Sequence, residues 1–174
     1  AEGLISSGRQ CILEGYAHKG GVHVYGIVDS IREGSHQSCF SHYQYPSQLP
    51  QSVQQRMIKA AKSFITHIDY ANSPFNREFY WDHKQDAIWL LEINTRISKS
   101  HCPLFKMVDG EYHHDVLIDV ALGNKPDFPH RQGQFKTAAK FMVRCHRDGR
   151  VMAVPGPAEV EALKKRFPET EVVL

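Results

Sequence analysis

The sequence predicts an α+β domain with a mostly antiparallel sheet and flanking helices. Two pairs of strand-like segments, each joined by a short turn, indicate antiparallel hairpins within residues 10–28 and 75–91. A long apolar stripe at helical spacing over residues 53–68 predicts an amphipathic helix. Together these patterns indicate a sheet that buries one face against a helix.

The first half of the chain supplies one hairpin and this helix. Residues 10–14 are expected to form a strand, and after Gly20-Gly21 the alternation in residues 22–28 predicts its partner. The polar stretch 34–49 predicts a loop or an irregular edge. Pro50 suits the first turn of the helix. Its core stripe consists of Val53, Met57, Ala61, Phe64 and Ile68, widened by Ile58 and Ile65.

Two short helices are expected after the second hairpin, over residues 103–108 and 116–121. A glycine follows each of them, Gly110 and Gly123. Glycine readily adopts the positive φ that often ends a helix.

The C-terminal stretch is expected to form a hairpin, a helix and a strand. The turn sequence Arg147-Asp148-Gly149-Arg150 separates two strand-like segments. We interpret residues 1–174 as a single domain, with 136–174 as its C-terminal extension. The expected elements are strands at 136–145 and 151–154, a helix at 158–167 and a strand at 171–174.

Length and composition fit an ordinary globular protein. The chain has 174 residues, 41% hydrophobic and 23% charged. Its net charge of +2 gives no footprint for nucleic acid, and no apolar run reaches the roughly 18 residues of a membrane span. There is no signal-peptide pattern, and the four cysteines form no CxxC pair. We therefore expect a cytoplasmic protein with reduced thiols.

Polar side chains follow the second hairpin's apolar strand at two-residue spacing: Glu92, Asn94 and Arg96. Because alternate strand residues share a face, Glu92 and Asn94 are expected on one face and Trp89, Leu91 and Ile93 on the other. An ionised Glu beside a buried apolar run requires a cation or hydrogen-bond donors.

Glu78 lies in the preceding strand, and positions 78 and 92 are equidistant from Gln85. A turn with an odd number of residues would place Glu78 directly opposite Glu92. A two-residue turn between Lys84 and Gln85 would instead pair Glu78 with Leu91. In the first register the two acids repel each other, and a divalent cation relieves that repulsion.

The oxygen ligands Glu78, Glu92 and Asn94 suit Mg²⁺ or Mn²⁺ better than Zn²⁺. Arg96 offers a planar fork for phosphate or carboxylate oxygens. The alternative is a buried Glu92–Arg96 ion pair without a cation, but such a pair needs no second acid.

The eleven histidines show no metal-ligand spacing. Adjacent residues such as His113 and His114 point in different directions on a helix and cannot chelate together. Only His101, at the end of the loop after Arg96, is a candidate site residue.

Glu78 and the run Glu92-Ile93-Asn94-Thr95-Arg96-Ile97, followed by His101 and Met107-Val108-Asp109-Gly110, resemble the metal-binding signature of ATP-grasp ligases. The likeness is greatest to the biotin carboxylase and carbamoyl phosphate synthetase branch. It implies the C-terminal lobe of an ATP-grasp fold.

The resemblance also implies roles for individual residues. Glu78, Glu92 and Asn94 would hold two Mg²⁺ ions that bridge the ATP phosphates. Arg96 would bind the acyl phosphate or the substrate, and His101 would belong to the same catalytic loop. The strand-to-hinge segment with Glu14 and Tyr16 would contact the nucleotide base. For Glu14 the alternative is a surface side chain at a strand end.

The implied activity is that of an ATP- and Mg²⁺-dependent ligase, which joins a small carboxylate to an amine or thiol through an acyl phosphate. Ser100 stands where biotin carboxylase has the Glu that acts as base towards bicarbonate, so bicarbonate chemistry is not expected. Two alternatives remain. One is a non-catalytic module, which binds a nucleotide or a partner protein or is purely structural. The other is a metal-dependent hydrolase with His101 as its base.

ATP-grasp enzymes clamp ATP between two lobes, and this sequence has no Gly-rich phosphate loop. We therefore expect an excised C-terminal lobe, inactive alone, whose N-terminal lobe belongs to the same polypeptide. The sequence leaves a homodimer open.

Overall fold

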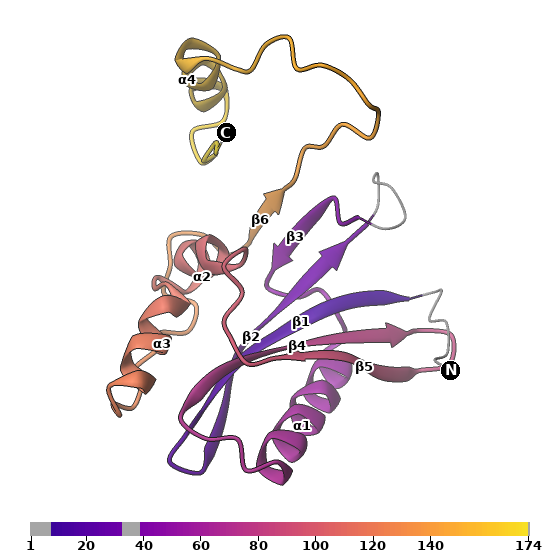
Figure 1. The fold of residues 1–174 in the computed structure, drawn as a ribbon, viewed down its shortest axis with the longest axis vertical. Helices are drawn as coiled ribbons and strands as arrows, with labels where there is room; N and C mark the ends of the chain where they lie inside the picture. Colours follow the sequence, from indigo (N-terminus) through magenta and orange to yellow (C-terminus); the bar gives the residue numbers. More distant parts are fainter. Residues whose placement is uncertain (1–7, 33–38, 174) are drawn as a thin grey trace. The chain divides into compact units, whose positions relative to one another are not determined.

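The computed structural model describes residues 8–32 and 39–173 (Figure 1). Contacts divide the chain into two compact units, residues 1–143 and residues 144–174. In the described part of the first unit the strands are β1 (Arg9–His18), β2 (Gly21–Ile31), β3 (His42–Tyr45), β4 (Ser73–Asp82), β5 (Ala87–Asn94) and β6 (Ala138–Phe141). Its helices are α1 (Gln51–His67), α2 (Cys102–Asp109) and α3 (His113–Ala121), and the second unit contains α4 (Pro157–Arg166).

The strands form one sheet in the order β5-β4-β1-β2-β3-β6, and every neighbouring pair is antiparallel. This confirms the predicted α+β class. The first hairpin is longer than expected, because Lys19 and Gly20 adopt positive φ values of 45° and 79°. Such a two-residue turn matches the twist of antiparallel strands, and β1 pairs with β2 from His18↔Gly21 to Gln10↔Ser30.

Helix α1 covers one face of the sheet and closes the main core (Figure 1). The helix and its apolar stripe are confirmed, although Ile68 follows the last turn and is exposed. The buried residues of α1 are Val53, Met57, Ala61 and Ile65. They share a core with side chains of β1 and β4 that include Cys11, Leu13, Phe75 and Phe79.

The opposite face of the sheet carries α2 and α3, so both expected short helices are confirmed. Helix α2 ends at Gly110, which has a φ of +97°. Two apolar clusters form on this face, one around Phe105 and one around Val116. Among the described residues neither cluster includes a member of β5, so the polar residues at that end of the face lie outside the core.

The expectation of a loop over residues 34–49 is wrong in part, because β3 lies within it. Residues 34–38 of that stretch lie outside the described residues. β3 pairs with β2 on one side and with β6 on the other. Its sequence, His-Tyr-Gln-Tyr, is too polar and too short to show an apolar alternation, and only Tyr45 is buried.

The expected hairpin over residues 136–154 is also wrong. Only residues 138–141 form a strand, β6, and it pairs with β3 rather than with residues 151–154. Val151 and Val154 are exposed and have no core to cover them within the described residues. Residues 171–173 form no strand either, and Leu174 lies outside the described residues.

Helix α4 confirms the last predicted helix. The Gly156 N–H donates to a carboxylate oxygen of Glu159 at 3.0 Å, which caps the first turn. Basic residues occupy the last turn, where their positive charge interacts favourably with the negative end of the helix dipole. None of the helices in the described ranges has the length and apolar character needed to cross a membrane.

Candidate active site

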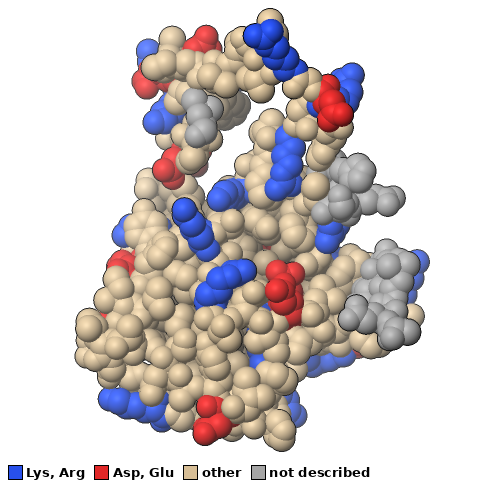
Figure 2. All heavy atoms as spheres, in the orientation of Figure 1, with Lys and Arg blue, Asp and Glu red and all other residues tan. Residues whose placement is uncertain are grey.

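Glu78 and Glu92 stand directly opposite each other on β4 and β5. The next residue along β4, Phe79, belongs to the core under α1. Since neighbouring strand residues point to opposite faces, Glu78 lies on the face away from α1. Figure 2 shows acidic atoms near the middle of one face of the molecule, with Lys and Arg side chains close by.

The predicted pairing of the two acids is confirmed, but the reason given for it is wrong. Asp82 pairs with Ala87, so the turn contains an even number of residues, 83–86. The acids still meet because the register shifts between Glu78 and Phe79, which leaves Leu91 as an extra residue in β5. This β-bulge does what an odd turn would have done.

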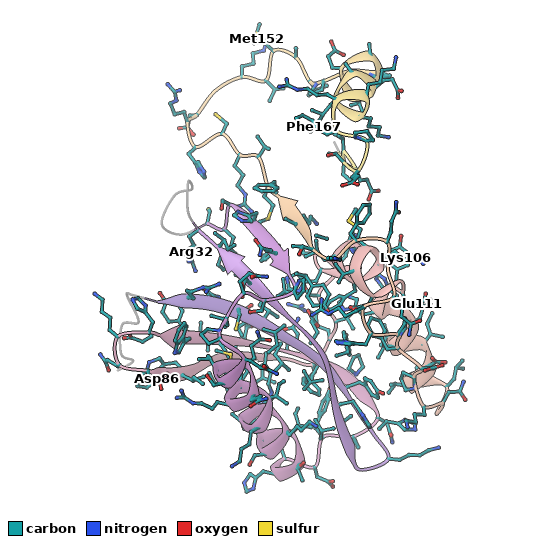
Figure 3. The ribbon with its side chains drawn as sticks, turned by 180° about the vertical axis from the view of Figure 1, so that it is seen from behind. Arg32, Asp86, Lys106, Glu111, Met152 and Phe167 are labelled. Carbon is teal, nitrogen blue, oxygen red and sulfur yellow. The ribbon has the colours of Figure 1, made fainter. Side chains whose placement is uncertain are left out.

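The turn itself is held against α1. Asp86, labelled in Figure 3, accepts hydrogen bonds from Arg56 at 2.7 Å and from the indole N–H of Trp81 at 3.1 Å. Its φ of 47° lies in the left-handed region. These contacts hold the four-residue turn in place, and this turn pairs Asp82 with Ala87.

β5 is not the buried strand that its apolar sequence predicts. It lies at one end of the sheet order, and Trp89, Leu90 and Leu91 are 48%, 41% and 42% exposed. Glu92 is exposed as well, whereas Glu78 on the inner strand is half-buried. The desolvation argument made for Glu92 therefore applies to Glu78.

Glu78 has an unusual electrostatic environment. Burial, followed by the charge of Glu92, raises the pKa of Glu78 above its ordinary value. A hydrogen bond from Gln10 and the positive charge of Arg96 act in the opposite direction. A divalent cation between the two acids would relieve the repulsion that raises this pKa.

Asn94 and Arg96 lie next to the acids. The Asn94 amide donates to Asn76 Oδ1 at 3.0 Å. Asn94 Oδ1 accepts a hydrogen bond from Arg96 Nη2 at 3.3 Å. The Asn94 amide oxygen and the Arg96 guanidinium therefore face each other beside the two acids.

These donors fit a hard divalent ion. Mg²⁺ takes one or two carboxylates and completes its octahedral shell with water and phosphate oxygens. Within the described ranges no group of three or more His, Cys, Asp and Glu side chains could hold a metal. The candidate is thus a two-acid site with an amide oxygen, which suits Mg²⁺ and is too poor in ligands for a closed zinc site.

Glu14 and His101 do not lie in this open site. Both side chains are 0% exposed, and Glu14 Oε1 lies 2.8 Å from His101 Nδ1. Burial raises the pKa of Glu14 well above its ordinary value and lowers the pKa of His101 to about 3. His101 is therefore neutral near pH 7, and burial favours the protonated form of the Glu14 carboxyl.

This burial argues against the roles that the sequence predicted for Glu14 and for His101. A carboxyl that contacts a nucleotide base needs an accessible oxygen, and neither the base-binding nor the surface alternative for Glu14 fits its position in the middle of β1. A neutral, enclosed His101 is poorly placed as a catalytic group. Tyr16 is buried too, and its ring stacks on His23 at 4.8 Å.

Comparison with known proteins identifies the family of this chain. Residues 30–127, more than half of the chain, match the family described as "Carbamoyl-phosphate synthase L chain, ATP binding domain". The chain belongs to this family. The match confirms the resemblance to the biotin carboxylase and carbamoyl phosphate synthetase branch of ATP-grasp proteins, and it spans Glu78, Glu92 and Asn94.

Among individual relatives, this ATP-binding domain is 34% identical over 80 residues to urea amidolyase of Saccharomyces cerevisiae, covering 46% of the chain and 4% of the relative. The fold resembles biotin carboxylase from Campylobacter jejuni in its "beta-gamma-ATP Complex", with a TM-score of 0.61, 24% identity, and coverage of 72% of this chain and 27% of that one. It also resembles an L-amino acid ligase from Bacillus licheniformis, with a TM-score of 0.68, 18% identity, and coverage of 82% and 35%.

The domain spans about a third or less of each of these relatives.

Two further residues of the site, Gln10 and Arg32, have no signal in the sequence. Gln10 Nε2 donates to Glu78 Oε2 at 2.9 Å, and Arg32 Nη2 donates to Gln10 Oε1 at 2.8 Å. Gln10 and Glu78 are 68 positions apart. Only the pairing of β1 with β4 brings them together, and no local pattern encodes it.

Proposed function

We propose that this domain is the acid-bearing half of the nucleotide clamp of an ATP-dependent carboxylate ligase. In the proposed reaction a carboxylate oxygen attacks the γ-phosphorus of ATP, ADP leaves, and an acyl phosphate forms. An amine or another nucleophile then attacks the acyl carbon and releases phosphate. The observation that supports this most strongly is the opposition of Glu78 and Glu92 in a family of ATP-binding domains.

The side chains have separate roles in this proposal. Glu78, Glu92 and Asn94 would hold Mg²⁺, which neutralises phosphate charge when it is bound. Arg96, exposed and in contact with Asn94, would orient the phosphate or acyl phosphate through its planar guanidinium. His101 would position the loop rather than transfer protons, since it is buried and neutral.

The proposed acceptor is an amine, so that the product has a new C–N bond. Ser100 lacks a carboxylate that could serve as base towards bicarbonate. The L-amino acid ligase, at 18% identity, shares only the fold with this chain, and an amine acceptor is compatible with that fold. We propose that a second lobe of the same polypeptide closes over the nucleotide and excludes water.

The test is ADP release from Mg-ATP by the full-length protein in the presence of a panel of carboxylates and amines. Carboxylate-dependent release that Glu92→Gln abolishes would support the ligase. The matched control is Glu111→Gln, at a position away from β4 and β5 (Figure 3). Turnover that survives Glu92→Gln would contradict the assignment. Nucleotide binding without carboxylate-dependent release would favour the non-catalytic module.

A further inference from the structure

The two carboxylate oxygens of Glu78 have different surroundings. Oε2 accepts the hydrogen bond from Gln10 Nε2 at 2.9 Å. Among the described residues no donor is hydrogen-bonded to Oε1. Gln10 is 8% exposed and sits on the adjacent inner strand, β1, one position before the Cys11↔Phe79 pair. One oxygen of Glu78 is thus engaged and the other is left for a ligand.

The orientation of Gln10 is itself determined by its second partner. Arg32 lies where β2 ends (Figure 3), and its Nη2 donates to Gln10 Oε1 at 2.8 Å. A guanidinium can only donate hydrogen bonds, so the amide oxygen must face Arg32 and the NH₂ group must face Glu78. The amide cannot flip without losing both contacts. Arg32 also lies over the ring of Phe40, 4.3 Å from its centroid, which restricts its own movement.

This arrangement has a consequence for cation choice. When one oxygen of a carboxylate accepts a hydrogen bond from a fixed donor, metal ligation through the other oxygen is favoured. Mg²⁺ and Mn²⁺ accept one-oxygen carboxylate ligands in octahedral shells. Ca²⁺ takes more ligands and often binds both oxygens of a carboxylate. A fixed hydrogen bond to Glu78 Oε2 therefore disfavours the larger ion.

We infer that Gln10 is a positioning residue that restricts Glu78 to one-oxygen ligation and so makes the site selective for Mg²⁺ or Mn²⁺ over Ca²⁺. The inference rests on the proposed function, because it takes Glu78 as a cation ligand. To the proposed cation site it adds Gln10, which acts on cation selectivity through Glu78 rather than as a ligand.

The test compares Mn²⁺ and Ca²⁺ affinities of the purified protein and its Gln10→Leu variant. Mn²⁺ is measured by electron paramagnetic resonance, and Ca²⁺ by its competition with Mn²⁺. Loss of a hydrogen bond to a metal ligand typically weakens metal affinity by about 10- to 100-fold. We expect Mn²⁺ to weaken by that factor while Ca²⁺ affinity stays the same or rises, so that the preference for Mn²⁺ falls at least roughly tenfold.

Two variants serve as controls. Gln85→Leu makes the same chemical change in the exposed turn between β4 and β5, and both affinities should match those of the unaltered protein. Gln10→Met keeps the length of the side chain without the donor, and should reproduce the loss of selectivity. Thermal unfolding without metal confirms that each variant is folded, and Met replaces Leu if the Leu variant is not.

The outcomes separate the inference from the proposed function. If Mn²⁺ binds and Glu92→Gln abolishes binding, but Gln10→Leu leaves the Mn²⁺ to Ca²⁺ ratio unchanged, the inference on Gln10 is overturned and the cation site stands. Parallel weakening of both ions overturns it too, because that indicates a general structural effect. If the unaltered protein binds no Mn²⁺, or Glu92→Gln has no effect, the cation site itself is wrong and the inference falls with it.

Discussion

The Nε2–H of His113 donates to the carbonyl oxygen of Ser98 at 2.9 Å, and this bond joins the first residue of α3 to the loop that follows Arg96. The same carbonyl accepts the backbone N–H of His101 at 3.1 Å. On its other side His113 Nδ1 accepts a hydrogen bond from the Tyr25 hydroxyl at 3.1 Å. A buried histidine thus holds the loop that follows Arg96 to the sheet.

Replacing this histidine should destabilise the fold. His113→Ala leaves the Tyr25 hydroxyl without its partner and opens a cavity, and we expect a loss of about 2–4 kcal/mol in the free energy of unfolding. Urea titration measures it. The exposed His130 provides the control, because His130→Ala should change stability by less than about 0.5 kcal/mol. Equal effects of the two substitutions would contradict the role assigned to His113.

The buried Glu14–His101 pair should give the protein a stability maximum near neutral pH. Burial lowers the pKa values of His101 and His113 from 6.5 to about 3, so the unfolded chain binds more protons at these sites and stability falls as pH drops below 6.5. Burial raises the pKa of Glu14, so the folded chain keeps a proton that the unfolded chain loses above pH 4.5. Stability should therefore also fall as pH rises above 6.5, by up to about 1.4 kcal/mol per pH unit.

Glu14→Gln isolates the second of these effects. An amide does not titrate and can still donate to His101, so the decline above pH 6.5 should disappear while the decline at acid pH remains. Urea unfolding at pH values from 5 to about 9 records both limbs. A decline at high pH that persists in the variant would mean that another group causes it.

Phe79 and Leu90 form one rung of the β4–β5 ladder but should contribute very differently to stability. Phe79 is 1% exposed and Leu90 is 41% exposed. We expect Phe79→Ala to cost about 3–5 kcal/mol and Leu90→Ala less than about 1 kcal/mol. Thermal or urea unfolding of the two variants gives the comparison, and similar losses would show that β5 is covered in solution.

Arg77 is a buried cation in the core under α1, and its removal should be tolerated. Its Nε and Nη2 atoms have no hydrogen-bond partner in the described part of the chain, and burial lowers its pKa to about 10. The guanidinium lies 4.4 Å from the centroid of the Phe64 ring, which offsets part of the desolvation cost. We expect Arg77→Met to raise the free energy of unfolding by roughly 1–2 kcal/mol. A clear loss of stability would show that the stacking outweighs the desolvation.

Local sequence patterns predicted the parts of the fold that local physics controls. The stripe of α1 repeats at helical spacing, and the glycines after α2 and α3 lie next to the helix ends. β3 was not predicted, because its four polar or aromatic residues show no apolar alternation. The strand is defined by its pairing with β2 and β6.

The candidate site was predictable only where its residues are close in sequence. The run from Glu92 to Arg96 was sufficient to suggest a cation site, and Glu78 followed from the adjacent strand. The β-bulge at Leu91 was not predictable, because nothing in an apolar strand marks which residue is left unpaired. Glu14 and His101, 87 positions apart, meet through tertiary packing that no spacing rule encodes.

The location of β5 at the rim of the sheet has a mechanical consequence. Its outer side carries no neighbouring strand within the described chain, whereas β4 is paired on both sides. An ion bound by both Glu78 and Glu92 would link β5, which is paired on one side, to β4, which is paired on both. Amide protons of β5 would then exchange with solvent more slowly when the ion is bound, so that the rim of the sheet would report occupancy of the site.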